Sequence, residues 1–110
     1  MKEMVDRGIV ESVKKYLSKL TEEGIPVQFG VIFGSYTQGR ANKWSDIDLV
    51  VVSKKYDKNY SHEDINRLWR AAARTDSRIE PIPCGVEEWE KDDERIIIEV
   101  ARREGVKIAA

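Results

Sequence analysis

The stretch DIDLVVVS, residues 46–53, constrains the fold most, because it places two acids directly before an apolar run. The centre of this stretch, residues 49–52, is continuously apolar, which is typical of a strand covered on both faces of its sheet. Asp46 and Asp48 are two residues apart, so they would point to the same side of that strand. At about 7 Å and an effective dielectric of about 20, two ionised carboxylates repel each other by roughly 2 kcal/mol. The pattern therefore predicts a buried strand whose entrance holds a cation.

The rest of the chain alternates between helical and strand patterns. Apolar residues at helical spacing predict helices, and runs of β-formers bounded by glycine or proline predict strands. The helices are expected over residues 2–23, 61–74 and, in two pieces, 87–104, with a short turn of helix over 36–41. The strands are expected over residues 27–33, 46–53, 79–84 and 106–108. This order predicts an α/β (α+β) fold class, with a small mixed β-sheet flanked by helices in one domain over residues 1–110.

Several residues within these segments have predicted positions. Gly24 is expected to cap the first helix, and Ser61 with Asp64 to form a capping box at the start of the second. Pro81 and Pro83 cannot donate to a ladder, which favours a sheet edge for their strand. The side chains expected to face the core from the later helices are Ile65, Leu68, Trp69, Ala72, Ile97, Val100 and Ala101.

Composition excludes several classes of protein. The 110 residues are 41% hydrophobic and 35% charged, the profile of a soluble globular domain. A net charge of -1 gives no electrostatic reason to expect direct nucleic-acid binding. The apolar runs are too short to cross a membrane and the N-terminus lacks a signal-peptide pattern, so a cytoplasmic location is expected. The single cysteine, Cys84, is interpreted as a buried thiol.

A second part of the site is predicted where Gly34 and Ser35 follow the strand over residues 27–33. A strand that leads into Gly-Ser and a helix start exposes backbone N–H groups that suit a phosphate. Mg²⁺ is usually held by one or two carboxylates together with water and phosphate oxygens, so Asp46 and Asp48 would supply the complementary clamp. The combination indicates a nucleotide site. It is not a P-loop, because no Lys-Ser or Lys-Thr follows a glycine at the required spacing.

These residues resemble a known family. The segment GSYTQGRANKWSDIDLVVV, residues 34–52, resembles the signature of the nucleotidyltransferase superfamily related to DNA polymerase β, in which Gly-Ser is followed after a loop by Asp-x-Asp. In length and layout the chain is similar to the minimal nucleotidyltransferase (MNT) proteins, which are often paired with a helical HEPN partner as a toxin–antitoxin system. The resemblance implies a polymerase β-like fold and Mg²⁺-dependent transfer of a nucleoside monophosphate, most simply AMP from ATP, to a hydroxyl.

The resemblance also implies roles for three acids. Asp46 and Asp48 would bind two Mg²⁺ ions. Glu80 lies at the one place that fits the family's third carboxylate, where it would complete one metal's shell and help to deprotonate the attacking hydroxyl. The alternatives are that Asp46 caps a turn and that Glu80 is an ordinary surface carboxylate paired with Arg78 or another arginine.

The nucleotide's phosphates would be bound by residues of the loop between the two strands. Gly34 and Ser35 are expected to bind them through the Gly-Ser turn. Many minimal members carry an arginine before the second glycine, where this chain has Gln38, so Arg40 or Lys43 would supply the triphosphate contact. In the same loop, Trp44 either packs in the core or borders the nucleotide base. Outside the loop, His62 is expected on the surface of its helix.

Two functions from different classes stay open. In the first, the chain is an enzyme that transfers AMP to a tyrosine of a HEPN toxin, as the resemblance implies for some antitoxins of this type. In the second, it is a binding module that neutralises a partner RNase by complex formation. The acidic segment over residues 87–94, with Trp89 within it, would then complement a basic partner. An oligomer is compatible with either function.

Overall fold

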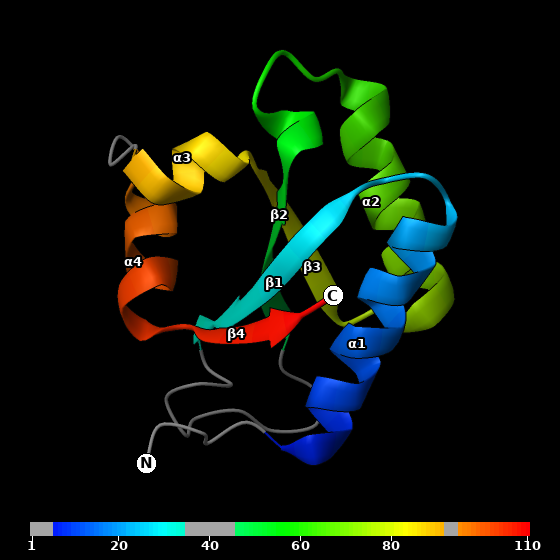
Figure 1. Cartoon of the computed structure of the whole chain (residues 1–110). Coiled ribbons are helices and arrows are strands. Elements are labelled where there is room, and N and C mark those ends of the chain that lie inside the picture. Colours follow the sequence, from blue (N-terminus) through cyan, green and yellow to red (C-terminus); the bar gives the residue numbers. More distant parts are fainter. Residues whose placement is uncertain (1–5, 35–45, 92–94) are drawn as a thin grey trace.

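The computed structural model describes residues 6–34, 46–91 and 95–110, and its helices and strands confirm the α/β fold class (Figure 1). The elements follow the chain as α1 (Arg7–Glu22), β1 (Val27–Phe33), β2 (Ile47–Ser53), the 3-10 turn η2 (Lys54–Tyr56), α2 (His62–Thr75), β3 (Ile79–Cys84), α3 (Val86–Lys91), α4 (Ile96–Glu104) and β4 (Val106–Ala109). None of the described helices combines the length and the apolar character that crossing a bilayer requires.

The strands form one four-stranded mixed sheet in the order β3-β2-β1-β4. β1 is antiparallel to both β2 and β4, and β2 is parallel to β3. A parallel pair needs a crossover connection, and α2 provides it. β3 lies at one edge of the sheet, which confirms the position that Pro81 and Pro83 predicted.

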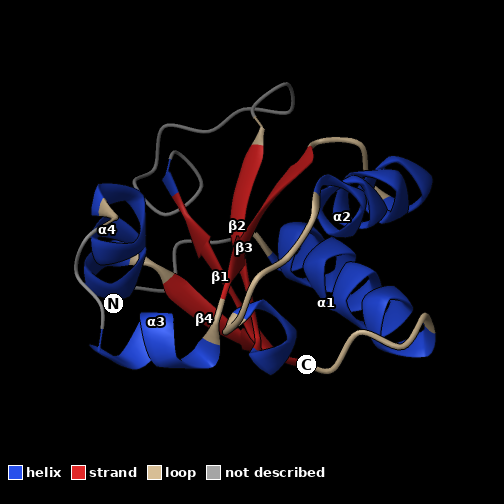
Figure 2. Ribbon diagram, turned by 90° about the horizontal axis from the view of Figure 1, so that it is seen from above, coloured by secondary structure: helices blue, strands red, loops and turns tan. Residues whose placement is uncertain are grey.

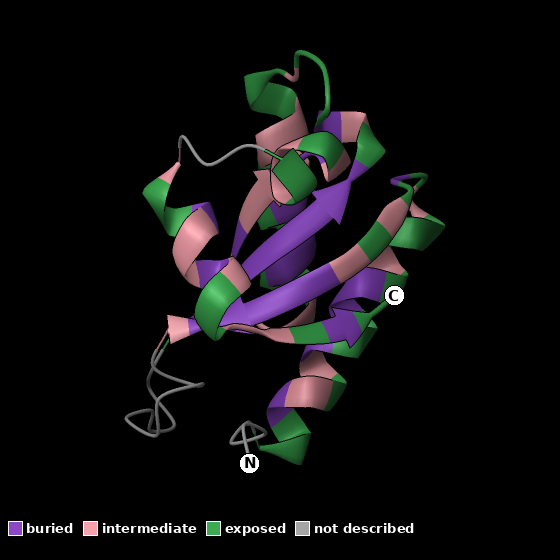
Figure 3. Ribbon diagram, turned by 60° about the vertical axis from the view of Figure 1, so that its left-hand side comes forward, coloured by how far each residue is buried: buried purple, intermediate pink, exposed green. Residues whose placement is uncertain are grey.

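Helices cover both faces of the sheet, with α1 and α2 on one side and α3 and α4 on the other (Figure 2). β2 is therefore buried almost throughout, as its apolar centre predicted (Figure 3). Leu49 and Val51 pack in the cluster beneath α1 and α2, and Val50 and Val52 pack in the cluster with Ile98 of α4. This alternation of faces also determines the side on which the acids of β2 point.

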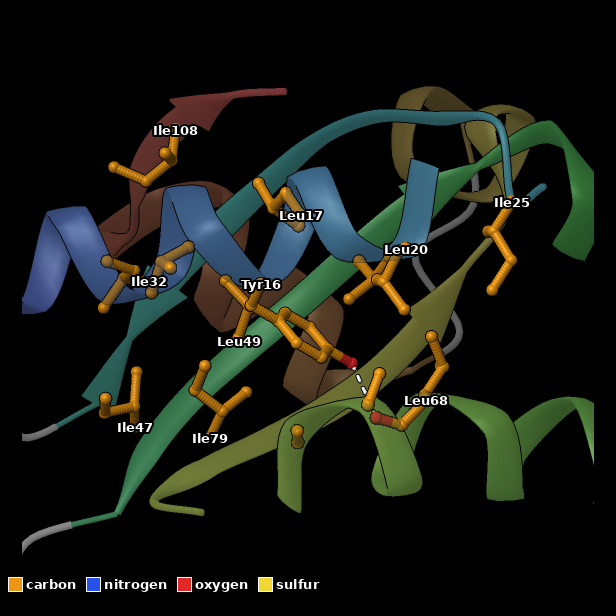
Figure 4. Packing of buried hydrophobic residues seen from close by; sticks show 14 of the residues in the cluster. Tyr16, Leu17, Leu20, Ile25, Ile32, Ile47, Leu49, Leu68, Ile79 and Ile108 are labelled. Atoms are coloured by element: carbon orange, nitrogen blue, oxygen red, sulfur yellow. Dashed lines mark hydrogen bonds between the residues drawn. The ribbon is translucent and has the colours of Figure 1, made fainter. Parts of the chain in front are cut away.

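The cluster beneath α1 and α2 is the larger of the two (Figure 4). Its side chains include Tyr16 and Leu17 of α1, both without exposed surface. The Tyr16 hydroxyl donates to the backbone carbonyl oxygen of Leu68 at 2.9 Å, which ties α1 to α2. Burial raises the pKa of Tyr16, because the phenolate would lose its solvation.

The ends of the first two helices largely follow the predicted signals. Gly24 has a φ of +93° directly after α1, and Ser61 and Asp64 form the expected capping box at the start of α2. The start of α1 at residue 2 was wrong. Asp6 is the N-cap, with its carboxylate accepting from the backbone N–H of Gly8 at 2.6 Å. The helix therefore begins at Arg7, because the N-cap residue itself has non-helical backbone angles.

Two predictions of core-facing side chains were also wrong. Trp69 is 45% exposed, because α2 packs through Leu68, Ala71 and Ala72 and so turns Trp69 to its flank. Ile97 is 42% exposed because only one residue of the isoleucine run at the start of α4 can face the sheet. That residue is Ile98, which has no exposed surface.

Candidate active site

Two of the three predicted carboxylates lie side by side on adjacent strands. The parallel register of β2 and β3 pairs Asp48 with Glu80, and neighbours in register project to the same side of a sheet. Asp48 also pairs with Phe33 at the end of β1, so the exit of β1 is at the same end of the sheet. On β2, Asp48 shares its face with Val50, which packs on the side of α3 and α4.

The third carboxylate, Asp46, precedes β2 and is exposed. Its carboxylate lies close to that of Glu80, and their interaction raises the pKa of Glu80 above its ordinary value. Partial burial and the charges of Asp46 and Asp48 raise that pKa further. The structure therefore brings all three acids together, although they come from two different strands.

The acids gather here without a basic partner among the ion pairs that join described residues. Asp48 is half-buried, and both burial and the neighbouring Asp46 carboxylate raise its pKa. Arg78, the alternative partner of Glu80, instead forms an ion pair with Asp76 at 2.7 Å.

Gly34 brings the exit of β1 against this cluster. Its φ is +83°, a conformation that L side chains rarely adopt, and a Cβ at this position would lie 2.5 Å from Oδ2 of Asp48. The backbone of Gly34 therefore approaches Asp48 more closely than any other residue type would permit. A ligand bound by Asp48 would be within reach of the backbone of Gly34.

The donor set fits a hard divalent cation in its chemistry, since it consists of carboxylate oxygens. Within residues 6–34, 46–91 and 95–110, however, no three His, Cys, Asp or Glu side chains are arranged to hold a metal ion. Metal binding by these acids therefore stays a prediction.

The remaining predicted site residues lie outside the described part of the chain. These are Ser35, Arg40 and Lys43, together with Gln38, Trp44 and the helical turn expected over residues 36–41. Their contact with a triphosphate stays a prediction.

Three residues weighed for other roles have clear positions. His62 is exposed at the start of α2, as expected. Cys84 is buried, which confirms the predicted buried thiol, and burial raises the pKa of that thiol to about 12. Trp89, which lies in the acidic segment, is half-buried. Its ring packs edge-to-face on Phe29 at 5.7 Å, with the guanidinium of Arg102 5.8 Å from its centroid.

Two arginines that no sequence pattern had indicated hold α3 and α4 together. Arg102 donates through Nε to the backbone oxygen of Trp89 at 2.6 Å and through Nη2 to that of Glu88 at 3.1 Å. Arg95 forms an ion pair with Glu88 at 3.1 Å. Only the tertiary fold places these residues near each other, so no local pattern could have indicated them.

Comparisons with known proteins agree with this geometry. The family model of the nucleotidyltransferase domain matches residues 10–107. The chain therefore belongs to the nucleotidyltransferase domain family, within the DNA polymerase β-like superfamily that the Gly-Ser and Asp-x-Asp motifs resemble.

Seven chains of known structure match, among them the crystal structure of a candidate nucleotidyltransferase from Sulfolobus solfataricus. That match has a TM-score of 0.65 and 17% sequence identity, and it covers 89% of this chain and 77% of the other. At this identity the likeness shows the shared fold alone. No curated protein matches the chain.

Proposed function

We propose that this nucleotidyltransferase is Mg²⁺-dependent and transfers AMP from ATP to a hydroxyl group. The observation that carries the proposal is the gathering of Asp46, Asp48 and Glu80 at one end of the sheet, beside the glycine turn at Gly34. Carboxylates that repel one another, and that form no ion pair with a basic side chain of the described residues, are a good clamp for a cation that arrives with a triphosphate.

Each residue has a distinct task in this proposal. Asp46 and Asp48 would hold two Mg²⁺ ions, which neutralise charge on the phosphates and lower the pKa of the acceptor hydroxyl. Gly34 and Ser35 would orient the phosphates through backbone N–H groups and the serine hydroxyl, with Arg40 or Lys43 adding a positive charge. Glu80 would complete one metal's shell and accept the hydroxyl proton.

The proposed acceptor is a tyrosine of a HEPN-type toxin, so that the transfer would make this chain an antitoxin. Support comes from the resemblance to minimal nucleotidyltransferases. A second candidate function is a non-catalytic antitoxin that neutralises a partner RNase by complex formation. It is favoured by the exposed Glu87 and Glu90 of α3, which would complement a basic partner.

Intact-mass spectrometry of a HEPN-type protein incubated with this chain, ATP and Mg²⁺ separates the two functions. An AMP increment on the partner supports transfer, and a complex without an increment supports occlusion. The Asp46→Asn and Asp48→Asn variants should abolish the increment. Glu22→Gln is the matched control, since it removes an exposed carboxylate at the end of α1, which leads into the start of β1 and not into its exit beside the acids. Transfer by both aspartate variants at the parent rate would contradict the proposed mechanism.

A further inference from the structure

One backbone hydrogen bond shows which backbone groups of β3, the edge strand, point away from the sheet. The N–H of Ile47 at the start of β2 donates to the carbonyl oxygen of Arg78 at 2.7 Å. In a parallel ladder alternate residues bond to the same neighbour, so Glu80 and Ile82 also direct their backbone groups toward β2. The backbone groups of the intervening residues, 79, 81 and 83, point away from the sheet.

This outward edge offers hydrogen-bond acceptors and no available N–H donor. Pro81 and Pro83 have no N–H at all. The N–H of Ile79 already donates to the carbonyl oxygen of Asp76 at 3.0 Å. A strand that adds to a sheet must exchange both donors and acceptors with the edge, so this edge cannot accept one. The edge is closed to strand addition directly beside Glu80.

The same edge does accept side-chain donors. Both terminal nitrogens of Arg95, Nη1 and Nη2, lie 3.4 Å from the outward carbonyl oxygen of Pro83. At the other end of β3, the outward carbonyls of Ile79 and Pro81 flank Glu80, beside Asp48 on the next strand. Carbonyl oxygens next to carboxylates give this end of the edge a negative character, which is complementary to basic N–H donors.

We propose that the acceptor is a folded protein that docks over the β3 edge through basic side chains and not as an added strand. The direction of approach rests on the proposed function. With the leaving pyrophosphate near Gly34 at the exit of β1, in-line displacement puts the attacking hydroxyl on the opposite side, over Glu80 of β3. The hydroxyl oxygen bonds to the α-phosphorus, the bond to pyrophosphate breaks, and the hydroxyl proton passes to Glu80.

A strand-forming probe tests the edge without any nucleotide chemistry. The probe is a fluorescent peptide that copies residues 78–85, with threonine in place of both prolines and serine in place of Cys84. We expect no binding to the parent chain and binding at least about tenfold tighter to the Pro81→Thr/Pro83→Thr variant, measured by anisotropy. Binding to the parent, or to neither protein, overturns the proposal.

Amide exchange in a milder variant covers the case in which the double variant does not fold. Pro83→Thr alone introduces one N–H, which by the register should point outward. Hydrogen–deuterium exchange followed by NMR should show this amide exchanging about as fast as loop amides, while the amide of Ile82 remains protected. Protection of the new amide equal to that of Ile82 would show that position 83 faces β2 and would overturn the proposal.

Two tyrosine peptides of equal composition test the acceptor. One is a stapled helix with arginines around the tyrosine, and the other is extended and alternating. With ATP and Mg²⁺, the helix should be modified at least about tenfold faster. Equal modification, faster modification of the extended peptide, or modification of neither while Mg²⁺-ATP still binds contradicts the docking proposal. If the parent does not bind Mg²⁺-ATP, the proposed function fails instead, and the strand probe still decides the nature of the edge.

Discussion

Two regions of this molecule differ in how far their polar groups are paired: the core beneath α1 and α2, and the cluster of acids at the start of β2 and β3. Beneath α1 and α2, side chains such as Leu17 have no exposed surface, and the hydroxyl of Tyr16 donates a hydrogen bond to the backbone oxygen of Leu68 (Figure 4). At the start of β2 and β3, three carboxylates meet without a basic partner among the ion pairs of the described residues. The first region supplies stability, and the second holds like charges together at a cost in stability.

The largest effect should come from the core beneath α1. Leu17→Ala removes a side chain with no exposed surface, so it should lower the free energy of unfolding by about 3 kcal/mol through lost burial and a residual cavity. Urea denaturation measures this change. Ile96→Ala, at a residue that is 79% exposed, is the control and should change stability by less than about 0.5 kcal/mol. Equal losses would mean that the assigned core is wrong.

A smaller effect is expected where the two regions meet, at Gly34. Gly34→Ala would place a Cβ 2.5 Å from Oδ2 of Asp48 at a positive φ, so it should cost about 2 kcal/mol and displace that carboxylate. Gly24→Ala is the matched control. Gly24 has a similar φ of +93° but no described atom within 4 Å of an added Cβ, so it should cost only about 1 kcal/mol. Identical unfolding free energies for the two variants would remove the argument for close approach at Gly34.

Acid titration tests Asp76, a carboxylate that has the basic partner Arg78. Hydrogen bonds from Arg78 hold the pKa of Asp76 at about 2, below its ordinary value of 3.8. A depressed native pKa stabilises the fold above the unfolded pKa, so this stabilisation should be lost as the pH falls from about 4 to about 2. Asp76→Asn should flatten the unfolding free energy over that window. An unchanged slope would show that the contact between Asp76 and Arg78 does not contribute.

The smallest change in stability should also have the opposite sign. Asp48→Asn removes one of the repelling charges, so it should raise the free energy of unfolding by about 1 kcal/mol. Thermal unfolding in metal-free buffer measures this gain. A loss of stability comparable to that of a core variant would mean that Asp48 supports the fold and is not held there at a cost.

Much of the fold was predictable because its signals are local. The continuous apolar run of residues 49–52 identified β2 as a strand covered on both faces, and the prolines of β3 identified an edge. The helix faces were less predictable. Trp69 and Ile97 fit the helical period, but docking against α1 and the sheet selected neighbouring residues instead.

The sequence predicted which acids belong to the candidate site better than it predicted how they are arranged. The spacing of Asp46 and Asp48 indicated a shared side of the strand. The position of Glu80 beside them depends on the register of β2 against β3, which is a tertiary property that the sequence does not display. The interaction between the carboxylates of Asp46 and Glu80, and the steric need for glycine at position 34, likewise appear only when distant segments meet.

Isothermal titration calorimetry of ATP into the parent and the Asp48→Asn variant, with and without Mg²⁺, tests the central claim most directly. If the acid cluster is a metal–nucleotide site, the parent should bind ATP only when Mg²⁺ is present, and the variant should lose at least about tenfold in affinity while remaining folded. Metal-independent binding, or equal affinity of the two proteins for Mg²⁺-ATP, would contradict it.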